Sequence, residues 1–141
     1  MASNIDSTKP IEGTPTTASV RANFATAKSE IESLQNANLL TWTNVTFANG
    51  WQNIGGANQT TQYTKMANGM VRIRGCISSG TIGTSAFNLP AGYRPVAANS
   101  YVSSGGGVIA QINISTSGDV TPSMGSAASI WLSTVEFDSG S

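Results

Sequence analysis

The sequence predicts a mainly β protein in which an extended N-terminal arm and one α-helix precede a small antiparallel β-sandwich or jelly-roll-like domain. Three observations predict this fold class. Only one stretch, near the N-terminus, has the apolar spacing of a helix. From Leu39 onward, short runs of Val, Ile, Thr, Tyr and Trp alternate with clusters of Gly, Asn and Ser. The length of 141 residues suits one domain with an appended arm.

Residues 1–16 are expected to form the arm. Pro10 and Pro15 disfavour helix in the residues that precede them, and no apolar period is present. Two interpretations are open: an arm that is free in solution, and an arm that becomes ordered on a partner. The first ten residues also lack the apolar segment of a secretory signal, so we expect a chain that is made and kept, or assembled, in a reducing cytosol.

Residues 17–37 are expected to form the helix, with Thr14 or Thr16 as its N-cap. Apolar side chains alternate at spacings of four and three along it, as in a coiled-coil seam. These candidate interface residues are Val20, Phe24, Ala27, Ile31 and Leu34. The stripe could pack on the chain's own β domain or form a short parallel bundle with copies of itself. Its narrowness favours the bundle.

Residues 39–141 are expected to form the β domain. Asn68-Gly69 predicts a two-residue type I′ hairpin, in which Lys65 pairs with Arg72 and Tyr63 pairs with Arg74. The predicted strands are 40–47, 61–66, 70–77, 85–88, 98–103, 108–115 and 128–137. The hairpin register places three basic side chains on one face: Lys65, Arg72 and Arg74. It places Met66, Val71, Ile73 and Ile77 on the other face, in the core.

The same strand pattern predicts the environments of several other parts of the β domain. Cys76 lies in an apolar strand and is expected to pack as a small hydrophobic side chain. Ser117-Gly118-Asp119 is expected to form a tight turn. The last predicted strand, 128–137, is apolar on both faces, so a second sheet or another subunit should cover each of them.

The composition excludes several classes of function. Charged residues make up 10 % of the chain, and 7 basic residues balance 7 acidic ones, so the basic excess of a nucleic-acid-binding protein is missing. With no histidine and one cysteine, His-based catalysis, His-ligated metal sites and an intrachain disulfide are excluded. No apolar run approaches the about 20 residues of a membrane helix. A surface so poor in charge suits an assembled protein covered by partners, with a monomeric binding module as the alternative.

Little in the sequence supports enzymatic chemistry. The β domain holds only three carboxylates, namely Asp119, Glu136 and Asp138, and Glu136 is the only candidate for a catalytic acid. No acidic residues have the loop spacing of a calcium site. We therefore predict a protein without enzymatic activity, catalytic residues, cofactor or metal, and without nucleic acid or membrane as a partner.

Two groups of side chains are candidates for contact with a partner or a glycan. The face of Lys65, Arg72 and Arg74, with Tyr63 beside it, is either a solvated hairpin face or a contact for an acidic partner or an anionic sugar. Three further aromatic residues are either sugar platforms or packed side chains. They are Trp42, Trp51 and Tyr101.

Two stretches carry a family resemblance. Residues 5–10 (IDSTKP) with residues 14–34 resemble the N-terminal arm and helix of small structural proteins of tailed-bacteriophage virions. Residues 87–95 (FNLPAGYRP), the Ile112–Ile114 strand, the Gly118-Asp119 turn and the Trp131 strand resemble the β-sandwich tip of phage tail-fibre, baseplate and head-fibre proteins. Together these stretches cover most of the chain.

The resemblance implies a homotrimer that is part of a virion assembled in the cytoplasm of a bacterial host. Residues 1–16 would attach to the major capsid protein or another virion protein, and the β domain would project. Because the chain has no long shaft, the resemblance favours a capsid decoration or head-fibre protein. The alternative is a tail-fibre or receptor-binding protein that recognises host surface carbohydrate.

Overall fold

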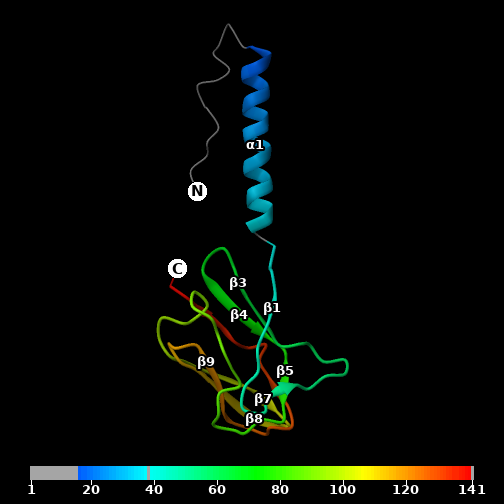
Figure 1. The fold of residues 1–141 in the computed structure, drawn as a ribbon, viewed down its shortest axis with the longest axis vertical. Coiled ribbons are helices and arrows are strands. Elements are labelled where there is room, and N and C mark those ends of the chain that lie inside the picture. Colours follow the sequence, from blue (N-terminus) through cyan, green and yellow to red (C-terminus); the bar gives the residue numbers. More distant parts are fainter. Residues whose placement is uncertain (1–15, 38, 141) are drawn as a thin grey trace. The chain divides into compact units, whose positions relative to one another are not determined.

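The computed structural model describes residues 16–37 and 39–140. The chain divides into two units, and the boundary in the sequence lies between Leu39 and Leu40. The first unit contains the helix and the second is the β domain (Figure 1). The expected arm lies outside the described residues, except for Thr16.

The helix α1 spans Thr17–Ala37. Its N-cap is Thr16, the second of the two expected candidates, because the Ser19 amide donates to Thr16 Oγ1 over 3.1 Å. Three large side chains of the predicted stripe lie exposed along it, with Phe24 at 71 %, Ile31 at 54 % and Leu34 at 59 %. In the part of the chain that the structure describes, α1 is the only helix, and it is too polar to cross a bilayer.

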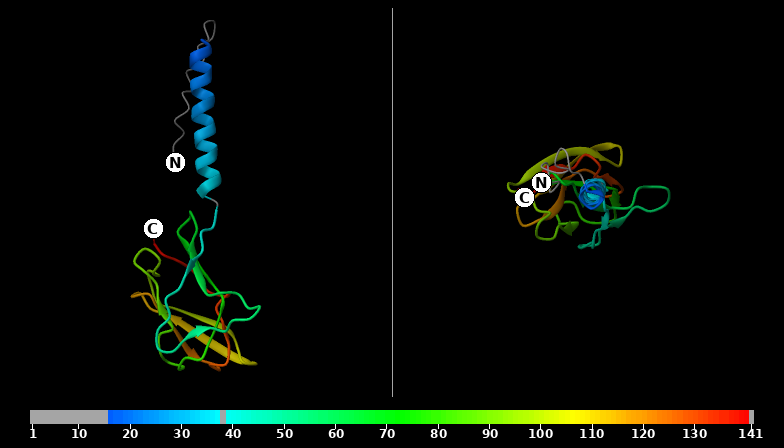
Figure 2. Two further views of the ribbon diagram at one scale, coloured as in Figure 1. Left: turned by 45° about the vertical axis from the view of Figure 1, so that its right-hand side comes forward. Right: turned by 90° about the horizontal axis from the view of Figure 1, so that it is seen from above.

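The β domain contains three antiparallel sheets, which confirms the predicted fold class of a mainly β protein with one helix. Their strand orders are β1-β3-β4-β11, β10-β5-β2 and β6-β9-β8-β7, and Figure 2 shows β7, β8 and β9 running side by side. The strands are β1 (Thr43–Asn44), β2 (Gln52–Asn53), β3 (Gln62–Lys65), β4 (Met70–Arg74), β5 (Cys76–Ser78), β6 (Phe87–Asn88), β7 (Asn99–Gly105), β8 (Val108–Ile114), β9 (Asp119–Met124), β10 (Ile130–Trp131) and β11 (Glu136–Asp138).

One hydrophobic core joins the three sheets. It receives Val71 and Ile73 from β4, and Ile112 and Ile114 from β8, all buried as the alternating pattern predicts. Strands β5, β6, β9, β10 and β11 add Ile77, Phe87, Val120, Ile130 and Phe137. Cys76 is also fully buried, as expected. The core therefore holds together strands that come from all parts of the domain.

The β3–β4 hairpin differs from the predicted register by one residue. Lys65 pairs with Val71 rather than with Arg72, and Gln62 rather than Tyr63 pairs with Arg74. The cause is a three-residue loop, closed by the Met66 amide donating to the Met70 carbonyl, with Gly69 at φ +86°. This geometry is a type I turn followed by a left-handed residue, and Ala67 therefore belongs to the loop.

Two predicted strands are each broken into two. Residues 70–77 divide into β4 and β5 at Gly75, whose φ is +123° and whose Cα hydrogen faces the Thr61 backbone too closely for any side chain. Residues 128–137 divide into β10 and β11 through a turn in which the Val135 amide donates to the Leu132 carbonyl. Because of this turn, apolar side chains from both faces of the predicted strand can enter the core. Ile130, Leu132 and Val135 are buried, whereas Trp131 is 38 % exposed.

Candidate functional site

The outer face of the sheet β1-β3-β4-β11 gathers most of the polar and charged candidates. Residues that are paired on neighbouring strands have side chains on the same face of the sheet. Two rows of such paired residues cross this sheet on the side opposite to the core. One row is Asn44, Gln62 and Arg74, and the other is Thr64, Arg72 and Glu136. We call the exposed part of this surface the arginine face, and it consists of Trp42, Asn44, Gln62, Arg72, Arg74 and Glu136.

Arg74 is held at two points on this face. Its Cζ lies 3.9 Å from the centroid of the Trp42 ring, within the range of a cation–π contact. Its Nε and Nη2 both donate to Gln62 Oε1, with an Nε–O distance of 3.0 Å. Gln62 Nε2 in turn donates to Asn44 Oδ1 over 2.8 Å. The guanidinium is therefore oriented by an indole ring and by a chain of amides.

Arg72 is neutralised by a neighbouring carboxylate. Its Nε lies 2.8 Å from Glu136 Oε2, across the β4–β11 pair, and both side chains are nearly half exposed. The residue that sequence reasoning singled out as a candidate catalytic acid is thus ion-paired with an arginine. Among the described residues, no group of three or more acidic or cysteine side chains forms a metal cluster around Glu136.

Lys65 and Tyr63 lie on the core side of the hairpin, so the expected grouping of Lys65 with Arg72 and Arg74 is wrong. This is a direct result of the register shift. The two residues contact the loop of residues 90–95: Lys65 Nζ donates to the Gly92 carbonyl over 2.9 Å, and the rings of Tyr63 and Tyr93 pack edge to face at 5.0 Å. Burial raises the pKa of Tyr63, and the Tyr93 hydroxyl adds to the effect.

The remaining aromatic candidates have separate environments. Trp51 is 3 % exposed and belongs to the core, so of its two alternatives the packed side chain is the one observed, and its ring is not an accessible sugar platform. Its Nε1 donates to Thr84 Oγ1 over 3.3 Å. Tyr101 is partly exposed and donates its hydroxyl to the Glu136 carbonyl over 2.8 Å, and burial is the main cause of its raised pKa. Among the three, only Trp42 lies against Arg74.

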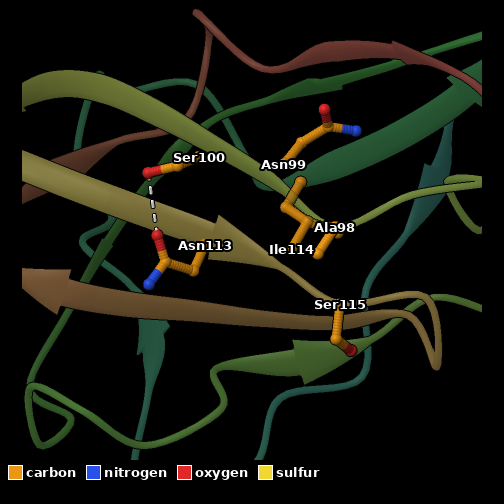
Figure 3. A pocket seen from close by; sticks show the side chains of 6 residues that line it. All are labelled: Ala98, Asn99, Ser100, Asn113, Ile114 and Ser115. Atoms are coloured by element: carbon orange, nitrogen blue, oxygen red, sulfur yellow. Dashed lines mark hydrogen bonds between the residues drawn. The ribbon is translucent and has the colours of Figure 1, made fainter.

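A separate pocket of about 300 Å³ lies where β7 begins and β8 ends (Figure 3). Figure 3 shows Ser100 and Asn113 joined by a hydrogen bond, which runs from Ser100 Oγ to Asn113 Oδ1 over 2.9 Å. Its lining consists of Ala98, Asn99, Ser100, Asn113, Ile114 and Ser115. The pocket has no ionisable side chain, so its chemistry is limited to neutral hydrogen bonding and apolar contact.

Sequence reasoning missed one polar network, around Asp119. The carboxylate accepts hydrogen bonds from Asn88 Nδ2 at 2.9 Å and from Ser117 Oγ at 2.8 Å, and these bonds lower its pKa. Arg94 donates to Asn88 Oδ1 and to the Leu89 carbonyl. Asp119 was predicted only as a turn residue, because Asn88 comes from a segment far away in the sequence.

Comparisons with known proteins give a likeness in fold. No family model and no curated protein matches the sequence. Among solved structures, the receptor binding protein gp15 of Listeria phage PSA has a similar fold, with a TM-score of 0.69 and 19 % sequence identity. The match covers 89 % of this chain and 80 % of that chain. At this identity the match establishes the fold, and it extends beyond the β domain alone.

Proposed function

We propose that this chain is a non-enzymatic structural protein of a bacteriophage virion, a short oligomeric fibre whose β domain acts as a receptor-binding tip. One observation carries the proposal: the fold is similar to that of a phage receptor binding protein over most of both chains. The motifs at residues 5–10, 14–34 and 87–95 independently resemble those of phage virion proteins.

The helix supports an oligomer. Phe24, Ile31 and Leu34 are more than half exposed in the single chain, although they form one stripe at coiled-coil spacing. Bringing copies of α1 together in a parallel bundle would remove this stripe from water, and the hydrophobic effect would stabilise the assembly. A homotrimer is the state that we propose, with residues 1–16 attached to another virion protein.

The comparison changes the choice between head and tail. A head-fibre or capsid-decoration role was favoured because the chain has no long shaft. This chain matches 80 % of the solved receptor binding protein, so the absence of a shaft does not argue against a receptor-binding role. Receptor binding therefore becomes the proposal, and the head-fibre role becomes the alternative.

Two measurements on the phage that encodes the chain test the proposal. Immunogold labelling of purified virions should place the protein at the tail, and purified full-length protein should compete with phage for adsorption to the host. Absence from purified virions would overturn the virion assignment. Labelling at the head, without competition for adsorption, would overturn the receptor-binding role and favour the head fibre.

A further inference from the structure

The arginine face carries a positive charge that its own side chains do not neutralise. Arg72 is paired with Glu136. No carboxylate among residues 16–37 and 39–140 forms a salt bridge with Arg74. Trp42 and Gln62 contribute an aromatic ring and an amide, both of which orient a guanidinium without cancelling its charge.

The hydrogen bonds of Arg74 within the protein use only some of the N–H groups of its guanidinium. A guanidinium has five N–H groups, and the two bonds to Gln62 Oε1 use Nε and one N–H of Nη2. In the described part of the chain, no acceptor engages Nη1. Because Arg74 is only partly buried, these remaining donors can be reached from solvent. An oxyanion with two or three oxygens is the ligand that matches such a fork.

The support behind Arg74 is typical of a preorganised site. Gln62 is itself fixed by Asn44, and the Asn44–Gln62–Arg74 row is also a row of backbone-paired residues on three adjacent strands. Holding a long side chain in place before binding reduces the entropy lost when a ligand binds. A salt bridge on the surface without this support would contribute little.

From these observations we infer that the Arg74–Trp42 pair is a subsite for an anionic group on a host surface saccharide, with a carboxylate or a phosphate bound at the free edge of the guanidinium. The inference rests on the proposed receptor-binding function and names the chemical class of the receptor. Asn44 and the partly buried Trp42 lie on the same face, where they can contact neutral hydroxyl and ring groups of the same saccharide.

Nuclear magnetic resonance titration of the full-length protein tests the subsite. The probes are glucuronate, glucose 1-phosphate and glucose, and the signals are the Arg74 Nε–H and Trp42 indole N–H. The anionic probes should shift both signals, more weakly as salt rises, and glucose should not. A shift with only one anion identifies carboxylate or phosphate as the group. Equal shifts with glucose, or no shift with either anion, would overturn the inference.

Variants separate this site from general charge effects. Arg74→Gln should weaken binding of the anionic probe about tenfold or more, and Arg74→Lys should weaken it less, because lysine keeps the charge but lacks the fork. Arg21→Gln on α1 removes the same charge elsewhere and should leave binding unchanged. Thermal unfolding of each variant shows whether the fold is retained. If folded Arg74→Gln binds the anions as wild type does, the subsite is wrong.

Failure of the subsite and failure of the proposed function are distinguishable in the adsorption assay. If wild-type protein competes with phage and folded Arg74→Gln competes equally well, receptor binding stands and the anionic subsite falls. If wild-type protein does not compete at all, the receptor-binding role falls, whatever the titration shows.

Discussion

Gly80 lies directly beneath the indole ring of Trp51, so close that a Cβ atom on residue 80 would overlap the ring. Trp51 is buried in the core of the β domain, and its Nε1 donates to Thr84. The glycine therefore provides the space in which the largest side chain of the core lies flat. Residue 80 therefore cannot gain a side chain unless the Trp51 ring or the backbone moves.

Gly80→Ala should destabilise the β domain by about 1–3 kcal/mol, because overpacking forces the Trp51 ring or the backbone to shift. Urea unfolding followed by tryptophan fluorescence measures the change. The double variant Trp51→Leu, Gly80→Ala serves as the control, since removal of the ring should make the added methyl group nearly neutral. If the alanine costs as much in the Trp51→Leu background, the steric explanation is wrong.

Ile31→Asp should dissociate the oligomer by placing a charge in the proposed helix seam, with the association constant reduced about a hundredfold or more. The β domain, which is a separate unit, should keep its near-ultraviolet circular dichroism. Sedimentation equilibrium measures the oligomeric state. Ser33→Asp adds the same charge on the opposite side of α1 and should leave the assembly intact. Loss of the β-domain signal in Ile31→Asp would instead assign the helix to the domain core.

Local patterns predicted the elements whose signals lie within a few residues. The apolar spacing and Thr16 predicted α1, and alternation predicted the buried residues of β4 and β8. Strand β9 is absent from the predicted strands, and it contains Pro122, which cannot donate to a sheet ladder. In the structure Pro122 pairs with Ile112 next to a bulge, where the ladder is already interrupted.

The candidate site was predicted only in part, because its geometry depends on register. Arg72 and Arg74 share a surface, but the three-residue loop that includes Ala67 places Lys65 and Tyr63 on the other side of the hairpin. Asn-Gly permits both two-residue and three-residue loops, and tertiary packing selects between them. The contact of Trp42 with Arg74 joins residues on different strands, so no local pattern could have shown it.

Asp119 should make the stability of the β domain depend on acid pH. Hydrogen bonds from Asn88 and then Ser117 lower its pKa below the ordinary value of 3.8, so the folded state favours the carboxylate. Its contribution is therefore present above about pH 3.8 and is lost as the pH falls through the lower, folded pKa. Urea midpoints measured between neutral pH and pH 2 should show this loss in wild type.

Asn88→Ala tests whether the hydrogen bond from Asn88 causes the lowered pKa of Asp119. Because it removes the hydrogen bond that lowers the pKa of Asp119 most, this pKa should rise towards 3.8, as measured from the carboxyl carbon resonance of Asp119. Asp119→Asn should lower the urea midpoint at neutral pH and reduce its acid dependence. An Asp119 pKa that stays the same in folded Asn88→Ala would show that another interaction holds it down.

The Arg72–Glu136 ion pair should contribute little to stability. Both side chains are nearly half exposed, so water and salt weaken their attraction. A double-mutant cycle with Arg72→Ala and Glu136→Ala should give a coupling of about 0.2–1 kcal/mol, and less at high salt. A much larger, salt-insensitive coupling would mean that β11 depends on this pair for its attachment to β4.

The reactivity of Cys76 can report on transient opening of the β domain. It is the only cysteine in the chain, it is completely buried in β5, and burial raises the pKa of its thiol. An alkylating reagent can reach the thiol only in molecules in which the three-stranded sheet β10-β5-β2 has opened. The rate of alkylation in native buffer, without denaturant, therefore reports how often that sheet opens.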